Sequence, residues 1–129
     1  MARRKSLAFL DVGQGDCFVA DTKSGAIIFD GGSSSEDQVG RYRILPYMKY
    51  LGYQKIQIAV ISHMDIDHYS GIKELLEMGK IKYLGLPKIP KDATMKKIIG
   101  IAKKRGTTIF YLSRGRQITT KDGSLKVLH

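Results

Sequence analysis

Four side chains able to bind a metal ion lie within residues 62–68, whose sequence is SHMDIDH. The segment directly follows an apolar run that predicts a buried strand. Alternate residues of an extended chain point to the same side, so His63 and Asp65 can meet one ion. If the chain then curls, Asp67 and His68 can turn toward a second ion. Two ions about 3.5–4 Å apart hold a bridging water and clamp a phosphoryl group for in-line displacement. The spacing therefore indicates a metal-dependent hydrolytic site, and the alternative is a hydrophilic loop with chance histidines and aspartates.

The strands and helices expected around this cluster indicate an α/β domain. Alternating apolar residues, turn residues and helix caps give the boundaries. We expect strands at residues 5–12, 17–22, 26–30, 55–62, 81–86 and 107–112, with a last strand beginning at 124. We expect helices at residues 41–51, 72–78 and from 92 or 94 to about 105, and a polar loop at residues 63–71. Up to residue 112 the order is βββαβαβαβ, without internal repeats.

Three motifs together resemble a known family. Residues 9–17 are FLDVGQGDC, residues 28–32 are IFDGG and residues 63–68 are HMDIDH. The last motif resembles the H-x-[HD]-x-D-H signature of the metallo-β-lactamase fold. The combination is similar to the metallo-β-lactamase-fold domain of the ComEC family of DNA-internalisation competence proteins. The resemblance covers residues 6–87 well and the remainder weakly.

The resemblance implies a set of metal ligands. His63 and Asp65 match the ligands of the first metal, and Asp67 and His68 match those of the second, with Asp67 the expected catalytic residue. Asp65 stands where many members of the family have histidine. An oxygen ligand in place of a nitrogen makes Mn²⁺ as suitable as Zn²⁺.

The other two motifs imply supporting residues. Asp30 matches an aspartate that supports the metal-binding loop from behind the ligands. Its alternative is a turn residue at a strand end. Gln14 and Asp16 match a loop that lies near the site in relatives, and their alternative is turn chemistry permitted by the neighbouring glycines.

The implied architecture is the N-terminal half of an αββα sandwich, with a mixed sheet and helices on one face. Residues 1–129 are thus expected to be a partial domain, with the C-terminal half and its later ligands missing. His129 is expected to be an ordinary terminal residue rather than a third ligand. We therefore expect weak or absent metal and no activity from this chain. We also expect a homodimer that buries the apolar faces of the strands at 5–12, 26–30 and 55–62.

Charge suggests a polyanionic partner. The net charge is +10, and residues 80–129 hold 13 Lys and Arg against 2 Asp and Glu, whereas residues 1–79 hold 9 against 10. Such a field attracts nucleic acid, although a solvated basic surface is the alternative. The expected third helix carries a basic face that could follow phosphates: Lys96, Lys97, Lys103, Lys104 and Arg105. Four tyrosines around the first helix could stack bases, but a place in the core and its rim is more common: Tyr42, Tyr47, Tyr50 and Tyr53.

Composition excludes several classes of protein. A hydrophobic fraction of 43% and a charged fraction of 26% are those of a globular domain. The single cysteine, Cys17, excludes an internal disulfide framework and a cysteine-rich zinc site, and we expect it to be a buried small apolar residue. No apolar run approaches the ~20 residues of a membrane span. We expect this chain to be soluble, and the resemblance implies a membrane-anchored parent with this domain outside the bilayer.

The function expected from these features is that of a fragment of a metal-dependent hydrolase, a DNA phosphodiesterase or nuclease domain acting in DNA uptake. One alternative is a nucleic-acid-binding module without catalysis. Another is a hydrolase of the same fold that acts on a small ester or phosphonate.

Overall fold

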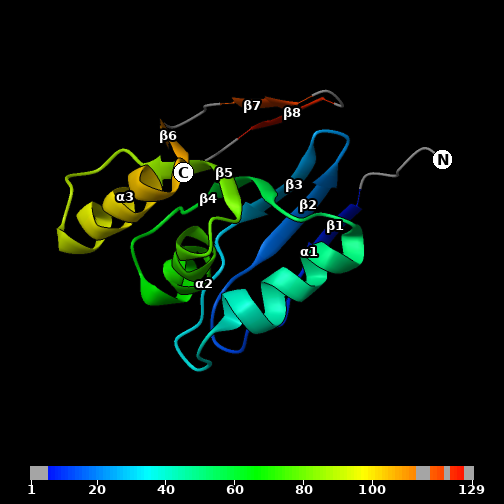
Figure 1. Cartoon of the computed structure of the whole chain (residues 1–129), viewed down its shortest axis with the longest axis horizontal. Coiled ribbons are helices and arrows are strands. Elements are labelled where there is room, and N and C mark those ends of the chain that lie inside the picture. Colours follow the sequence, from blue (N-terminus) through cyan, green and yellow to red (C-terminus); the bar gives the residue numbers. More distant parts are fainter. Residues whose placement is uncertain (1–5, 113–116, 121–122, 127–129) are drawn as a thin grey trace.

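A six-stranded mixed sheet forms the centre of the protein (Figure 1). The computed structural model describes residues 6–112, 117–120 and 123–126. The strands follow one another across the sheet in chain order: β1 (Ser6–Phe9), β2 (Phe18–Thr22), β3 (Gly25–Phe29), β4 (Ile56–Val60), β5 (Ile81–Pro87) and β6 (Thr108–Leu112). The first three strands are antiparallel, and β3 to β6 are parallel. This mixed α/β arrangement confirms the expected fold class.

The helices of the described chain cover one face of the sheet (Figure 1). They are the π-helical turn η1 (Gly40–Ile44), α1 (Leu45–Leu51), α2 (Ile66–Glu77) and α3 (Ala93–Arg105). The π-turn has a local cause. The Leu45 N–H donates to the Gly40 carbonyl five residues back, and the next residue, Pro46, has no N–H to continue the ladder. The longest of these helices has 13 residues, and within the described chain none is both long and apolar enough to cross a membrane.

Three features differ from those expected from the sequence, and the first is that β1 ends at Phe9 rather than at residue 12. Helix α2 begins at Ile66, six residues before the expected start at residue 72. The amides of His68 and Tyr69 already donate to the Asp65 carbonyl, so residues 66–71 of the expected polar loop form the first turn and a half of the helix. A short hairpin of β7 (Gln117–Thr120) and β8 (Gly123–Lys126) holds one strand that the sequence did not predict.

The main core lies between the sheet and the helices. From the sheet it receives Ile28 and Leu84, both fully buried, and from the helices Met48, Leu75 and Ile98. Alternation along a strand sends the next residue to the opposite face. Ile28 therefore faces the helices and Phe29 faces away from them.

The face without helices carries an apolar row. Phe9, Phe18 and Phe29 are cross-strand neighbours on β1, β2 and β3. Their ring centroids are 4.8 Å apart for Phe9 and Phe18 and 5.9 Å apart for Phe18 and Phe29. Phe9 is 82% exposed and Leu7 is 67% exposed. We call this row of three phenylalanines the open-face row.

Candidate metal centre

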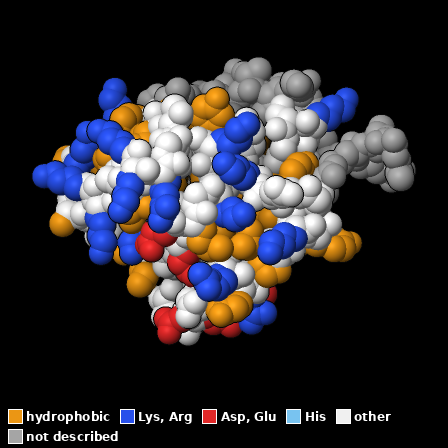
Figure 2. Space-filling view, viewed as in Figure 1, with side chains coloured by type: hydrophobic (Ala, Val, Ile, Leu, Met, Phe, Trp, Pro, Cys, Tyr) orange, Lys and Arg blue, Asp and Glu red, His pale blue; other side chains and the backbone are white. Residues whose placement is uncertain are grey.

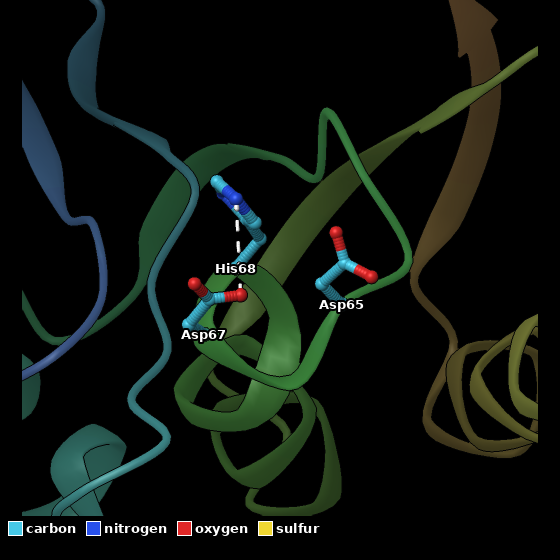
Figure 3. Close-up of side chains that lie close together, drawn as sticks. All are labelled: Asp65, Asp67 and His68. Carbon is cyan, nitrogen blue, oxygen red and sulfur yellow. Dashed lines mark ion pairs between the residues drawn. The ribbon is translucent and has the colours of Figure 1, made fainter.

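Three of the four predicted ligands meet where β4 gives way to α2 (Figure 3). Asp65 occupies the N-cap position of α2, and Asp67 and His68 lie in its first turn. One ligand atom from each of the three lies within 4.8 Å of the other two. Because β4 is parallel to its neighbours, this is the edge at which the carboxyl ends of β3, β4 and β5 also meet. We call Asp65, Asp67 and His68 the ligand group.

The imidazole of His68 is surrounded by carboxylates. Its Nε2 atom lies 3.8 Å from Oδ1 of Asp67. Its Nδ1 atom lies 3.2 Å from Oδ2 of Asp30 and 3.6 Å from Oδ2 of Asp16. This Nδ1 atom is buried and makes no hydrogen bond within the part of the chain that the structure describes. Clustered carboxylates repel one another, and a cation between them removes that penalty. The donor set of two carboxylates and one imidazole fits a divalent metal ion.

His63 lies beside the ligand group. Its ring centroid is 5.2 Å from that of His68, and its Nδ1 atom lies 2.9 Å from Oγ of Ser62. Among the described residues, the ligand group does not include His63. The expected pairing of His63 with Asp65 assumed an extended segment followed by a curled loop. Because α2 begins at Ile66, Asp65 lies instead with Asp67 and His68, and a ligand role for His63 stays a prediction.

Asp30 holds the loop that carries the ligands. Its backbone φ is 58°, in the left-handed region that a non-glycine residue adopts at a cost. In this conformation its Oδ1 accepts from the Ser62 amide and its Oδ2 from the Ser62 hydroxyl, both at 2.7 Å. Oδ2 is also the atom nearest to Nδ1 of His68. Asp30 is therefore a turn residue that also binds the segment before α2, and its role in supporting a metal stays a prediction.

The loop after β1 contributes mainly backbone. The Gln14 carbonyl accepts from the Ser34 amide at 2.8 Å, and the Asp16 amide donates to the Asp67 carbonyl at 3.1 Å. A Cβ atom on Gly15 would clash with the Gly32 carbonyl oxygen and lie 2.9 Å from the Asp67 carbonyl oxygen. The glycines thus allow the loop after β1 and the loop after β3 to approach the first turn of α2 closely. Asp16 adds a carboxylate near His68, whereas Gln14 acts through its carbonyl.

Comparison with known proteins agrees with this geometry. The family model of the metallo-beta-lactamase superfamily matches residues 10–124. The chain belongs to the metallo-beta-lactamase superfamily. This membership confirms the family resemblance that the three sequence motifs indicated.

Two known proteins that are similar to the chain are longer than it. ComE operon protein 3 of Bacillus subtilis (strain 168) is 30% identical over an alignment of 137 positions, which covers 92% of this chain and 17% of that protein. A solved structure of a mutant of the CmlA beta-hydroxylase aligns with a TM-score of 0.55 at 14% identity, over 99% of this chain and 25% of that one. The chain thus spans about a sixth and a quarter of these proteins. The second likeness supports the superfamily fold alone.

The basic residues divide into two groups along α3. The five that the sequence singled out are all exposed, and Lys and Arg gather on the side of the molecule where α3 lies (Figure 2). Lys96 and Lys97 lie in the first turns of α3, which starts at the sheet edge that holds the ligand group. The basic residues of the last turn lie about 9–14 Å further along the helix axis at a rise of 1.5 Å per residue: Lys103, Lys104 and Arg105. Two further exposed lysines, Lys88 and Lys91, follow β5 at the nearer end, and only their place after a strand could have indicated them.

The four tyrosines have separate roles. Tyr42 and Tyr50 are 64% and 82% exposed. Tyr47 stacks on Tyr50, and the Tyr53 hydroxyl donates to Asp21 at 2.5 Å. None of the four belongs to the ligand group. His129 lies outside the described residues, so its expected terminal role is not placed.

Proposed function

We propose that this chain is part of a metal-dependent hydrolase domain that acts on the phosphodiester bonds of DNA during DNA uptake. The observation that carries the proposal is the ligand group at the start of α2, with Asp30 and Asp16 behind His68. A divalent cation bound there would supply an activated water and neutralise phosphate charge. Asp65, Asp67 and His68 would hold it, and Asp67, the more exposed member of its pair with His68, would face the substrate.

Manganese or zinc is the proposed metal. Two carboxylates and one imidazole favour a hard ion more than a purely nitrogen site would, which supports Mn²⁺ beside Zn²⁺. The ligand group offers donors for one ion. We therefore expect weak, exchangeable binding and no appreciable turnover by residues 1–129 alone, since positioning and charge neutralisation supply most phosphoryl-transfer catalysis.

DNA is the proposed partner because Lys96 and Lys97 lie at the same sheet edge as the ligand group. The motif resemblance to the competence family and the similarity to ComE operon protein 3 support a role in DNA uptake. We propose that the domain lies outside the bilayer in a membrane-anchored protein, as the resemblance implies. The basic surface favours one rival, a binding module that needs no metal. A small ester or phosphonate remains the other substrate class to test.

A salt series separates these functions. The experiment measures the affinity of the chain for labelled single-stranded DNA between 50 and roughly 300 mM salt, with Mn²⁺ or with a chelator. Our proposal predicts that Mn²⁺ tightens binding and that Lys96→Ala with Lys97→Ala weakens the metal-dependent part. The paired control, Lys103→Ala with Lys104→Ala, removes the same charge about 10 Å further along α3. Binding that ignores the metal would favour the binding module, and cleavage that is lost in His68→Ala would contradict the expected inactivity.

We further propose that a second copy of the chain covers the open-face row. The row is apolar and runs across three neighbouring strands. In a two-fold symmetric dimer, the open-face rows of the two copies would lie between two packed sheets. In the αββα sandwich that the motif resemblance implies, this face of the sheet packs on a second sheet. A homodimer is the simplest arrangement of this chain that buries Phe9.

A further inference from the structure

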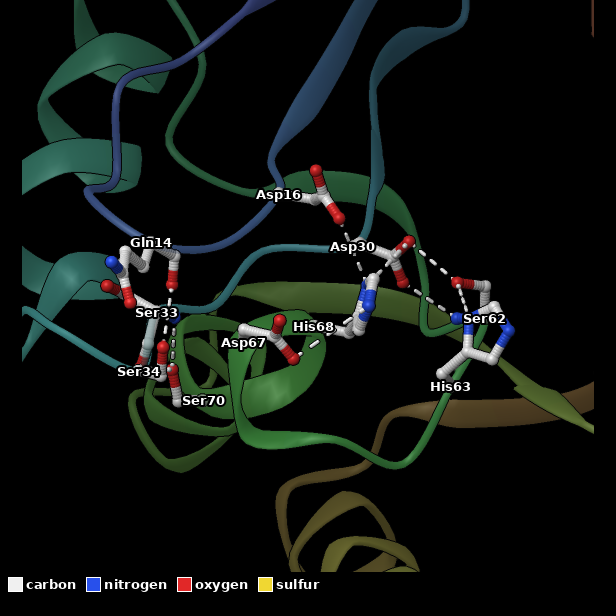
Figure 4. A network of polar contacts seen from close by, with 10 residues as sticks. All are labelled: Gln14, Asp16, Asp30, Ser33, Ser34, Ser62, His63, Asp67, His68 and Ser70. Atoms are coloured by element: carbon white, nitrogen blue, oxygen red, sulfur yellow. Dashed lines mark hydrogen bonds and ion pairs between the residues drawn. The ribbon is translucent and has the colours of Figure 1, made fainter.

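Ser62 joins Asp30 to His63 through its hydroxyl group (Figure 4). The Ser62 hydroxyl lies 2.7 Å from Oδ2 of Asp30 and 2.9 Å from Nδ1 of His63. The Ser62 amide meets the other carboxylate oxygen, also at 2.7 Å. Both oxygens of Asp30 are thus engaged by the residue that immediately precedes His63.

The number of protons available to the hydrogen bonds between Asp30, Ser62 and His63 determines the tautomer of His63. A hydroxyl group carries one proton, and an ionised carboxylate only accepts. The Ser62 proton must therefore go to Asp30, which leaves an oxygen lone pair directed at Nδ1 of His63. Nδ1 must carry a proton to satisfy that contact. In a neutral imidazole the lone pair then lies on Nε2.

His68 lies beside the same carboxylate. Its Nδ1 atom lies 3.2 Å from Oδ2 of Asp30, and its Nε2 atom is the one near Asp67. The two imidazoles lie side by side, with ring centroids 5.2 Å apart. Asp30 therefore acts on His68 directly and on His63 through Ser62. The Nδ1 atom of His68 faces Asp30, and the Nδ1 atom of His63 faces the Ser62 hydroxyl.

We propose that Ser62 is a positioning residue that holds His63 in the Nδ1–H tautomer, so that His63 offers Nε2 to the cation of the ligand group. This inference rests on the proposed metal-dependent function. Hydrogen bonds to the second nitrogen of a ligating histidine orient the ring and raise its basicity, and their loss typically weakens metal binding about 10–100-fold. Here the hydrogen bond to His63 comes from the Ser62 hydroxyl, which itself binds Asp30. One aspartate therefore lies beside one histidine and is connected to the other through a serine.

Nitrogen NMR of the metal-free protein tests the tautomer directly. At about pH 8 in a chelator, the ¹⁵N shifts of the His63 ring should report a protonated Nδ1 and an unprotonated Nε2 in the wild type. Ser62→Ala should shift His63 toward the Nε2–H tautomer that a free histidine side chain prefers in water. Ser62→Thr restores the hydroxyl and should restore the wild-type shifts. The matched control is Ser70→Ala, because the Ser70 hydroxyl contacts Ser33 and neither histidine.

Asp30→Asn provides a second variant, in which residue 30 donates a hydrogen bond to the Ser62 hydroxyl instead of accepting one from it. The side-chain carbonyl of the introduced asparagine can still accept from the Ser62 amide, which turns the NH₂ group of the asparagine toward the Ser62 hydroxyl. The hydroxyl then has its own proton available for Nδ1 of His63, so the tautomer should reverse. This reversal does not depend on a stable Ser62→Ala protein.

Metal affinity supplies the second readout. Mn²⁺ binding should weaken by about 10-fold or more in Ser62→Ala and return in Ser62→Thr. A wild-type His63 with its proton on Nε2, or a tautomer unchanged by both Ser62→Ala and Asp30→Asn, would overturn the inference. The predicted tautomer in a wild-type protein that binds no Mn²⁺ would instead overturn the proposed function.

Discussion

At the scale of single residues, Asp30 combines a backbone conformation that is costly with hydrogen bonds that offset the cost. The sequence placed this residue in an Asp-Gly-Gly motif at a strand end, which left a turn and a supporting role open. Its left-handed φ of 58° shows the turn, and its two contacts with Ser62 fix the segment that precedes α2. Neither the φ nor the partner could be predicted, because both depend on where β4 lies beside β3.

Replacing Asp30 tests both contributions. Asp30→Ala loses two hydrogen bonds to a charged group and keeps the left-handed strain, so we expect a loss of about 2–4 kcal/mol in the free energy of unfolding. Asp30→Gly loses the same bonds but relieves the strain, and should be about 1–2 kcal/mol more stable than Asp30→Ala. Urea unfolding measures both variants. Equal stability of the two would contradict the strain at this position.

Cys17 gives a pH-dependent prediction. Burial, with a smaller effect from the negative charge of Asp30, raises the pKa of the Cys17 thiol from 9.0 to about 12. Between these values the unfolded chain loses the thiol proton and the folded chain keeps it. The free energy of unfolding should therefore fall as the pH rises above 9.

Two measurements check this prediction. Native protein at pH 8 should react with a thiol reagent far more slowly than unfolded protein, because Cys17 is 1% exposed. The decrease in the free energy of unfolding between pH 9 and 11 should be smaller in Cys17→Ala than in the wild type. Rapid labelling of the native protein would refute the buried environment.

At the scale of elements, the sequence predicted the strands well and the start of α2 poorly. The strands carry runs of β-branched and apolar residues between turn residues, and these patterns are local. The beginning of α2 is polar because its first turn carries two members of the ligand group, Asp67 and His68. Its buried stripe, with Ile72, Leu75 and Leu76, appears only later in the helix. Helical periodicity therefore detected the second half, and the functional half resembled a loop.

Gly32, which lies against α2, and Gly100, which lies on α3, offer a matched pair of substitutions. A Cβ atom on Gly32 would clash with the Ile66 carbonyl and lie 2.8 Å from the Ser70 amide nitrogen, both of them backbone in α2. Gly100 is exposed on α3, and a Cβ atom there meets nothing within 4 Å. Gly32→Ala should destabilise the protein by about 1–3 kcal/mol through overpacking.

Gly100→Ala should stabilise the protein by about 0.5–1 kcal/mol through helix propensity. Thermal unfolding of both variants measures the difference. Gly32→Ala should also weaken Mn²⁺ binding, because it separates the loop after β3 from the ligand group. A Gly32→Ala protein as stable as Gly100→Ala would show that the close approach of the two backbones is not needed.

At the scale of the whole molecule, the two faces of the sheet differ in what they can tolerate. Ile28 faces the helices and is fully buried, so Ile28→Asp should unfold the chain rather than separate a dimer. Phe9 and Phe29 belong to the open-face row, so Phe9→Asp with Phe29→Asp should keep the fold. Sedimentation should then show a dimer for the wild type at tens of micromolar and a monomer for the double variant. A wild-type monomer at that concentration, with no binding of a hydrophobic dye, would refute the proposed homodimer.

The central claim is that the start of α2 binds a divalent cation. Bound Mn²⁺ broadens the NMR signals of nearby nuclei, so it locates such a site even when binding is weak. In a ¹⁵N-labelled protein, low Mn²⁺ should first broaden the amide signals of Asp65, Asp67 and His68. Glu74 and Glu77, near the opposite end of the same helix, serve as an internal control about 10–15 Å away. Our account predicts that His68→Ala with Asp67→Ala abolishes the selective broadening while the spectrum stays folded. Broadening that begins at Glu74 and Glu77, or that persists unchanged in the double variant, would contradict it.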